Sequence, residues 1–333
     1  AFGTFALMLR SPDLATSAQV GSACALVHDW ADTAGLRTVA LLFAEAAAHA
    51  DPQNPARANL AARSARRAMM FDRAGTWHLR AYKLAVRSRN RTEIVWALRG
   101  YGLMMKETGR VVEARRFLQR ATRRATAFGR RKEAAMAHHD LMNIAVEQAR
   151  FRLAEMHADA ALSLYPVNHP RIPALGHDFA FVLLRQNHNS AALPLLEHVI
   201  PFIHRPDERS LALSTLAWAA AGAGRHARLD SAERATLELV AIHDDYAAPA
   251  FLHLAEAWRA SGNLVRAQRY VDEAERAATT RNELHFVREA AEMRGQLRNA
   301  SGGAVPDYPP GPRTQVLLRH LTARIKAWKK APD

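Results

Sequence analysis

Two stretches of this 333-residue chain, residues 95–128 and 248–281, share one spacing of large and small residues. In each, a large residue is followed three places on by a large–small pair, then by another large residue, a glycine and a segment of the form Ala–x3–large–x2–Ala. The first copy uses Leu98, Tyr101, Gly102, Met105, Gly109, Ala114, Leu118 and Ala121, and the second uses Phe251, Leu254, Ala255, Trp258, Gly262, Ala267, Val271 and Ala274. Spacings of three and four residues on both sides of a glycine predict two helices joined by a turn. A hairpin that repeats along a chain predicts a solenoid, in which each unit packs on its neighbours.

Further copies follow the same phase, with units starting near residues 59, 95, 135, 173, 210 and 248. The units from 135 and 173 keep the pattern through Leu141, Ala145, Ala154, Ala158 and Ala161, and through Phe179, Ala180, Leu183, Ala192, Leu196 and Val199. The unit from 59 is looser (Ala65, Met69, His78, Tyr82, Ala85), and Leu229 and Glu233 fit the second helix of the unit from 210 badly. No stretch alternates apolar and polar residues for long enough to predict a strand, so we expect an all-α fold.

The composition along the chain divides it into four parts. Residues 1–58 read as N-terminal helices that form an imperfect first repeat, from residues 13–30 and 35–50, and residues 59–298 form the array. Residues 299–313 are dense in Gly and Pro and predict a linker. Residues 314–333 predict a basic amphipathic helix, with Leu318, Leu321, Ile325 and Trp328 on one stripe and Arg319, Arg324, Lys326, Lys329 and Lys330 around it. We favour a helix that folds back and caps the last exposed hydrophobic face of the array; the alternatives are an anionic membrane surface, which we disfavour, and the groove of another protein.

Several classes of function find no support in the sequence. One cysteine, Cys24, excludes an internal disulfide and a cysteine-based zinc site, and we expect it to pack inside a helix. The densest histidine set is His138, His139 and His157 with Asp140, without HExxH or comparable spacing, so we expect no metal. No nucleophile with an ordered base and no glycine-rich phosphate loop is present, so we expect a non-enzymatic protein without a cofactor.

Location and completeness are expectations of the same kind. No apolar run approaches the roughly 20 residues that cross a bilayer, and the start of the chain is a poor secretory signal, so we expect a cytoplasmic protein. The chain does not begin with Met, which is compatible with a lost upstream segment.

The net charge of +14 is concentrated in one part of the chain. Residues 57–132 contain 21 Lys and Arg against 4 Asp and Glu, whereas residues 133–333 contain 23 of each kind. Such a concentrated positive field favours acidic partners, whether peptide, nucleic acid or anionic surface.

The repeated hairpin resembles the tetratricopeptide repeat (TPR) family over residues 59–281, although the Trp–x2–Leu–Gly opening and most of the closing prolines of that family are missing. Long units without those prolines are similar to the arrays of peptide-sensing bacterial regulators and kinesin light chain. The resemblance implies a right-handed α-solenoid of about six to seven hairpins. It also implies that the first helices line the concave face and that the fifth and ninth positions of each unit point into it.

The resemblance places basic and amide side chains in that groove. The fifth and ninth positions here are Arg63 and Arg67, Arg99 and Leu103, His139 and Asn143, and His177 and Phe181, while Trp96 and Lys106 lie beside them. Carboxylate-clamping members of the family hold a peptide's C-terminal acid with Lys, Arg and Asn at such positions. We therefore expect a peptide-binding groove formed by Arg63, Arg67, Trp96, Arg99, Lys106, His139, Asn143 and His177. The alternative is that these residues are solvated polar side chains on an open face.

A second basic cluster lies on the later helix of the unit from 95, on the side away from Ala114, Leu118 and Ala121. Its members are Arg116, Arg120, Arg123, Arg124, Arg130, Arg131 and Lys132. A solvated convex surface is the first interpretation, and a footprint for a phosphate backbone is the second.

Three hypotheses follow from these patterns. The preferred one is a scaffold or sensor module that binds an acidic or carboxylate-terminated protein segment. The first alternative is a nucleic-acid-associated transcriptional regulator that uses the second basic cluster. The other is a scaffold that forms a homo-oligomer through its end repeats.

Overall fold

The protein is described by a computed structural model that covers residues 2–11, 14–300, 303 and 305–328. Over these ranges the chain is a succession of α-helices with no strand, which confirms the predicted all-α class. The chain forms two compact units, Ala1–Leu141 and Met142–Asp333, and the division falls inside helix α8 (Arg131–Glu147). The two units are described separately below.

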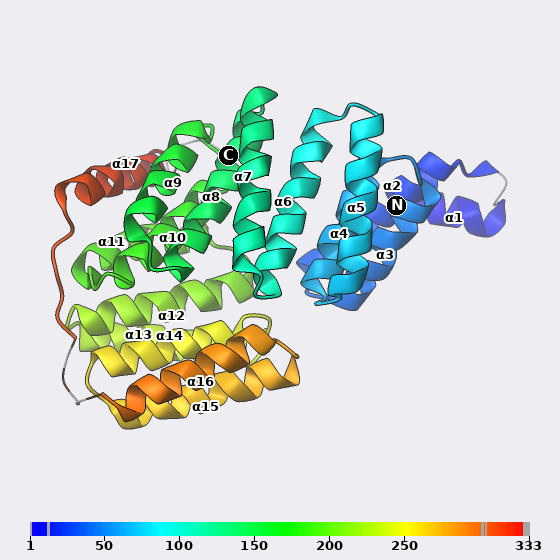
Figure 1. Ribbon diagram of the computed structural model, residues 1–333. Helices are drawn as coiled ribbons and strands as arrows, with labels where there is room; N and C mark the ends of the chain where they lie inside the picture. Colours follow the sequence, from blue (N-terminus) through cyan, green and yellow to red (C-terminus); the bar gives the residue numbers. More distant parts are fainter. Residues whose placement is uncertain (1, 12–13, 301–302, 304, 329–333) are drawn as a thin grey trace. The chain divides into compact units, whose positions relative to one another are not determined.

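Unit 1 consists of consecutive helices that pack in antiparallel pairs, drawn in blue to green in Figure 1. A short first helix, α1 (Phe2–Arg10), precedes three hairpins. The hairpins are α2 (Ser17–Thr33) with α3 (Arg37–Ala50), α4 (Pro55–Arg67) with α5 (Phe71–Arg87), and α6 (Arg91–Glu107) with α7 (Val111–Ala127). The helix pair α2–α3 lies in the part of the chain for which residues 13–30 and 35–50 predict a hairpin.

The turns between these helices share one backbone device. From α4 to α9, a residue with positive φ follows each helix end, at Met69, Arg89, Gly109, Gly129 and Ala149, so these turns recur at equal intervals along the chain. At Gly109 the next amide, of Arg110, donates to the Met105 carbonyl at 2.8 Å, which is the helix-ending pattern that such a residue permits. Glycine adopts this conformation without strain, whereas Met69, Arg89 and Ala149 adopt it at a cost.

Small residues mark the surfaces where helices meet. The alanines of the repeat are fully buried, and so are the large residues between them (Ala114, Leu118, Ala121, Ala267, Val271, Ala274). On α6, a Cβ at Gly102 would lie 2.9 Å from Leu118 Cγ of α7, so only glycine permits this close approach. The repeat spacing therefore identifies the helix contacts directly.

Unit 2 continues with further pairs, drawn in green to orange in Figure 1. After α9 (Phe151–Leu164) come α10 (Ile172–Leu184) with α11 (Asn189–Val199) and the 3₁₀ turn Ile200–Phe202, and α12 (Pro206–Gly222) with α13 (His226–Val240). The last pair, α14 (Ala247–Ala260) with α15 (Leu264–Thr280), is followed by α16 (Leu284–Arg298), which packs on α15.

Glu233, which fits the repeat badly, has a specific place in α13. Its buried carboxylate accepts hydrogen bonds from Trp258 Nε1 at 2.8 Å, from Tyr270 Oη at 2.5 Å and from Arg266 Nη2 at 3.2 Å. Because three donors from α14 and α15 compensate the buried charge, this carboxylate ties two hairpins together.

The C-terminal helix α17 (Pro312–Trp328) folds back onto α9, α10 and α11, and not onto the final hairpin. The segment before it is fastened to unit 2: Asp307 accepts from the Asn189 amide at the start of α11 at 2.6 Å, and Tyr308 N donates to Asn187 O at 2.8 Å. The buried face of α17 carries Leu317, Leu321 and Ile325. Of the predicted basic residues of this helix, Lys329 and Lys330 lie outside the described residues, as do residues 301, 302 and 304 of the predicted linker. No helix in the described ranges is long and apolar enough to cross a membrane.

Candidate functional site

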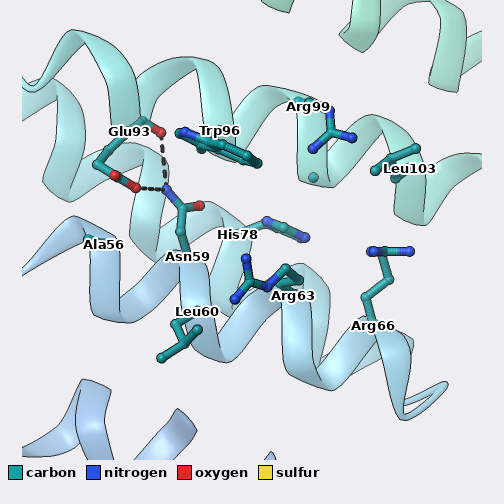
Figure 2. A pocket seen from close by; sticks show the side chains of 11 residues that line it. Ala56, Asn59, Leu60, Arg63, Arg66, His78, Glu93, Trp96, Arg99 and Leu103 are labelled. Carbon is teal, nitrogen blue, oxygen red and sulfur yellow. Dashed lines mark hydrogen bonds between the residues drawn. The ribbon is translucent and has the colours of Figure 1, made fainter. Parts of the chain in front are cut away.

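A pocket of about 160 Å³ lies in unit 1 between α4 and α6, with His78 of α5 at its inner wall. It brings together three of the residues that the sequence predicts for the groove: Arg63, Trp96 and Arg99. The other lining residues are Ala56, Asn59, Leu60, Arg66, His78, Glu93, Gly100 and Leu103. Figure 2 shows the side chains of α4 facing those of α6 across the pocket.

Arg63 supplies the positive charge of this pocket. Within the described part of the chain its guanidinium has neither an ion pair nor a hydrogen bond, and its side chain is exposed to solvent at the pocket. The surrounding protein lowers the pKa of Arg63 by removing hydration, with Arg67 and Arg66 acting in the same direction and Asp32 opposing them. An anion beside Arg63 would favour its charged form and relieve this unfavourable environment.

His78 is the most unusual group in the pocket. Its side chain is only 3% exposed, and neither ring nitrogen has a hydrogen-bond partner. Burial lowers the pKa of His78 to about 3, and the nearby charge of Arg66 adds to the effect. The ring is therefore neutral at pH 7, with one nitrogen able to donate and the other to accept. Leaving such groups unpaired costs about 1–3 kcal/mol each, which a ligand that bonds to them would recover.

Asn59 also keeps an unsatisfied atom at this site. Its Nδ2 donates to the Glu93 carboxylate at 2.7 Å and to the Glu93 carbonyl at 3.1 Å, so the orientation of the amide is fixed (Figure 2). Its Oδ1 is buried and accepts no hydrogen bond. The pocket thus presents a cation, a neutral imidazole and a carbonyl acceptor.

The other arginines near the pocket are engaged within the protein. Arg99 is buried and donates to both carboxylate oxygens of Asp140, at 2.5 and 3.0 Å, and its guanidinium carbon lies 5.3 Å from the Trp96 ring centroid. Arg66 pairs with Glu107, and Arg67 Nη1 lies 3.1 Å from Asp32 Oδ2. These arginines therefore shape the pocket, while Arg63 provides a charge with which no carboxylate of the described residues forms an ion pair.

Two groove residues of unit 2, one on α8 and one on α10 itself, also contact a carboxylate of α10. Asn143 Nδ2 donates to Asp178 Oδ2 at 2.9 Å, and His177 contacts Asp178 Oδ1 and Thr215 Oγ1 at 3.0 and 3.1 Å. Asp178 holds the same repeat position in the unit from 173 as Asp140 holds in the unit from 135. An Asp at this position thus bonds to a groove residue of the preceding unit.

The remaining predicted residues lie apart from the pocket. His139 is buried in α8, and Lys106 is half-buried near the end of α6. In the second basic cluster, Arg116, Arg120, Arg123, Arg124, Arg130, Arg131 and Lys132 are all exposed.

Sequence reasoning missed Asn59, Arg66 and His78 as pocket residues. The turn residues Met69, Gly109 and Ala149 lie at equal spacing, so His78 is equivalent to Leu118, and the unit predicted from residue 59 begins four residues earlier, which gives Asn59 and Arg63 its fifth and ninth positions. A buried histidine ring in place of leucine requires space in the facing helix. Gly100 of α6 provides it: a Cβ there would lie 3.0 Å from each His78 ring nitrogen and closer still to Cε1.

In comparisons with known proteins, no family model and no curated protein matches this chain. Similar solved structures include BtubC (BKLC) from P. vanneervenii, which is 13% identical, with a TM-score of 0.49 over 68% of this chain and 91% of that chain. A signal transduction ATPase with numerous domains (STAND) with a tetratricopeptide repeat sensor, from Pyrococcus horikoshii, is also 13% identical, with a TM-score of 0.47. That match covers 90% of this chain and 50% of that one. A TPR domain matches at 13% identity over 93% of this chain and 99% of that chain, with a TM-score of 0.26. Tetratricopeptide repeats are thus among the similar structures, and the hairpin fold itself rests on the helix pairs described above.

Proposed function

We propose that the protein is an interaction or sensor module and that its pocket between α4 and α6 holds an acidic, carboxylate-terminated segment of a partner protein. The observation that carries this proposal is Arg63, a guanidinium that lies in a pocket without a carboxylate partner among the described residues. A guanidinium fork matches a carboxylate in geometry as well as in charge.

The neutral groups of the pocket favour a peptide end over a simple anion. A terminal carboxylate bonds to Arg63, while the amide N–H of the same residue can donate to the unsatisfied Asn59 Oδ1. The volume of about 160 Å³ suits one small residue, since a cavity of about 150 Å³ holds benzene in an engineered protein. The Trp96 ring offers an apolar wall for that residue.

A direct test compares short acidic peptides that end in a free carboxylate with the same peptides ending in an amide. Fluorescence anisotropy with the full chain should show binding of the carboxylate form, and Arg63→Gln should weaken it about 10- to 100-fold, because hydrogen bonds to charged groups contribute about 1.5–3 kcal/mol.

The matched control is Arg57→Gln on the same helix, because Arg57 donates to Ser22 Oγ at 3.1 Å and does not line the pocket. The proposal fails if the amide peptides bind equally well, or if Arg57→Gln weakens binding as much as Arg63→Gln does. Circular dichroism verifies that both variants keep their helices.

A second candidate function is binding of nucleic acid by the exposed basic cluster of α7 and the start of α8. The observation that favours it is the exposure of all seven cationic side chains. Binding of this kind weakens steeply with salt, so a DNA or RNA oligonucleotide that does not shift at about 50 mM salt would exclude it.

A further inference from the structure

Helix α17 occupies a groove formed by three successive helices of unit 2, the second helix of one repeat and both helices of the next. It packs on α9, α10 and α11. At Gly176 of α10, a Cβ would lie 2.8 Å from Ile325 Cδ1, so the glycine makes room for α17. Leu195 and His198 of α11 line a cavity together with Leu318 of α17, and Glu155 of α9 accepts from Thr314 Oγ1 at 2.6 Å.

The equivalent helices of unit 1 are α5, α6 and α7. The positive-φ turn residues Gly109 and Asn187 align Ala114 with Ala192 and Leu118 with Leu196, and the turn residues Met69 and Ala149 align Phe71 of α5 with Phe151 of α9. The residues that contact α17, or line the cavity beside it, then correspond to residues of unit 1. Leu98 corresponds to Gly176, Phe117 to Leu195, Arg120 to His198 and Gly75 to Glu155.

These four residues of unit 1 line a single cavity of about 650 Å³. The cavity extends along α5 from Phe71 to Tyr82 and along α6 from Ala97 to Thr108, which is about three helical turns. Its lining includes Tyr101, Met104 and Met105, and Leu79 is 52% exposed. Unit 1 therefore has an open apolar groove where unit 2 holds an amphipathic helix.

The charges of the two grooves differ. Helix α17 is basic, and its groove presents the carboxylate of Glu155. The groove of unit 1 presents Arg120, Arg110, whose Nη2 lies 3.1 Å from Glu113 Oε1, and one acidic lining residue, Asp72. Arg120 bonds to the neutral hydroxyl of Tyr82 at 3.2 Å and has no carboxylate partner in the described ranges.

We propose that the groove between α5 and α7 binds an amphipathic helix of a partner protein, with an apolar stripe against Tyr101 and Phe117 and acidic residues beside Arg120. Helices recognise such grooves through apolar residues spaced three and four apart. Because Leu98 fills the space that Gly176 leaves open, the partner carries a small residue where α17 carries Ile325. This groove is lined by α5, α6 and α7 and shares only His78 with the lining of the pocket between α4 and α6, so it does not rest on the function proposed above.

The probe is a fluorescein-labelled peptide with the sequence of residues 312–328, in which Arg313, Arg319, Arg324 and Lys326 are replaced by glutamate and Ile325 by alanine. We expect saturable binding to the full chain in fluorescence anisotropy. Leu79→Glu and Arg120→Glu should each weaken it at least tenfold, since both place a negative charge in the groove. Both side chains are exposed, so neither substitution disturbs the core.

Two controls match these variants in helix and in charge. Val86→Glu adds a charge on α5 at a residue that is 47% exposed and outside the groove, and Arg123→Glu reverses an exposed charge on α7 outside the groove. Both should bind the acidic peptide within about twofold of the wild-type affinity.

Three results would overturn the proposal. Equal loss in the control variants would show diffuse electrostatic attraction, and equal binding of the unmodified basic peptide would remove the charge selectivity. Absence of peptide binding, together with binding of a DNA oligonucleotide that Arg120→Glu abolishes, would assign the surface to nucleic acid instead.

Discussion

The contact between Gly100 and His78 predicts that Gly100→Ala reverses the usual effect of this substitution. Inside a helix, alanine is favoured over glycine by about 1 kcal/mol. At Gly100, however, the added Cβ would lie 3.0 Å from both nitrogens of the buried His78 ring. Overpacking of this kind costs about 1–3 kcal/mol, so we expect a net destabilisation of unit 1 by about 1 kcal/mol.

A double-mutant cycle isolates the clash. In a His78→Ala background the ring is absent, so Gly100→Ala should stabilise unit 1 by about 1 kcal/mol, which gives a coupling energy of about 2 kcal/mol. Urea unfolding followed by circular dichroism measures all four proteins. Gly295→Ala is the control, because a Cβ at this exposed helical glycine has no atom within 4 Å, and it should stabilise in both backgrounds. The reasoning is refuted if Gly100→Ala changes stability by the same amount with and without the His78 ring.

Two further predictions follow from buried groups. Because burial lowers the pKa of His78 to about 3 from 6.5, its contribution to stability is complete above pH 6.5 and is lost as the pH falls toward 3. Between pH 7 and pH 5 the free energy of unfolding should fall by about 2 kcal/mol because of His78 alone. Urea titrations at the two pH values should show a smaller fall for His78→Gln than for the wild type. The same pH dependence in both proteins would contradict this prediction. Ile325→Ala should lower the free energy that holds α17 in its groove by about 2–4 kcal/mol, because the Ile325 side chain is fully buried beside Gly176. Hydrogen exchange should then show faster exchange of the amides of α17 alone, and unchanged exchange would refute the prediction.

The sequence predicted the hairpins because each one repeats a local pattern. Alanine and large residues at spacings of three and four mark the buried faces, and Gly109 and Gly262 mark turns whose positive φ suits glycine. The turns were harder to recognise in the sequence where a residue other than glycine adopts positive φ, as Met69, Arg89 and Ala149 do. Glu233 broke the pattern because its partners Trp258 and Tyr270 come from the next hairpin.

The candidate site was harder to predict, because charge pairing joins side chains from different repeats. The family resemblance placed Arg63 and Arg99 in one groove, and the structure brings them to one pocket. It could not distinguish Arg99, which forms an ion pair with Asp140, from Arg63, which has no carboxylate partner in the described ranges. That distinction depends on where the sixth residue of the following unit lies, a whole repeat further along the sequence, and no local spacing encodes it.

The position of helix α17 gives a reason for the difference in charge between the groove of α5, α6 and α7 and the groove of α9, α10 and α11. Both grooves descend from one repeat pattern, so an amphipathic helix that fits the first has an approximate fit to the second. The basic residues Arg319, Arg324 and Lys326 of α17 would meet Arg120 in the groove of unit 1, and a like-charge contact disfavours binding at an interface. In its own groove, Arg324 Nη2 instead donates to the carbonyls of Tyr165 and Pro166, at 3.0 and 2.9 Å, just after the end of α9. The charge of α17 therefore keeps it, in the same chain or in a second copy, out of the unit 1 groove and leaves that groove to an acidic helix.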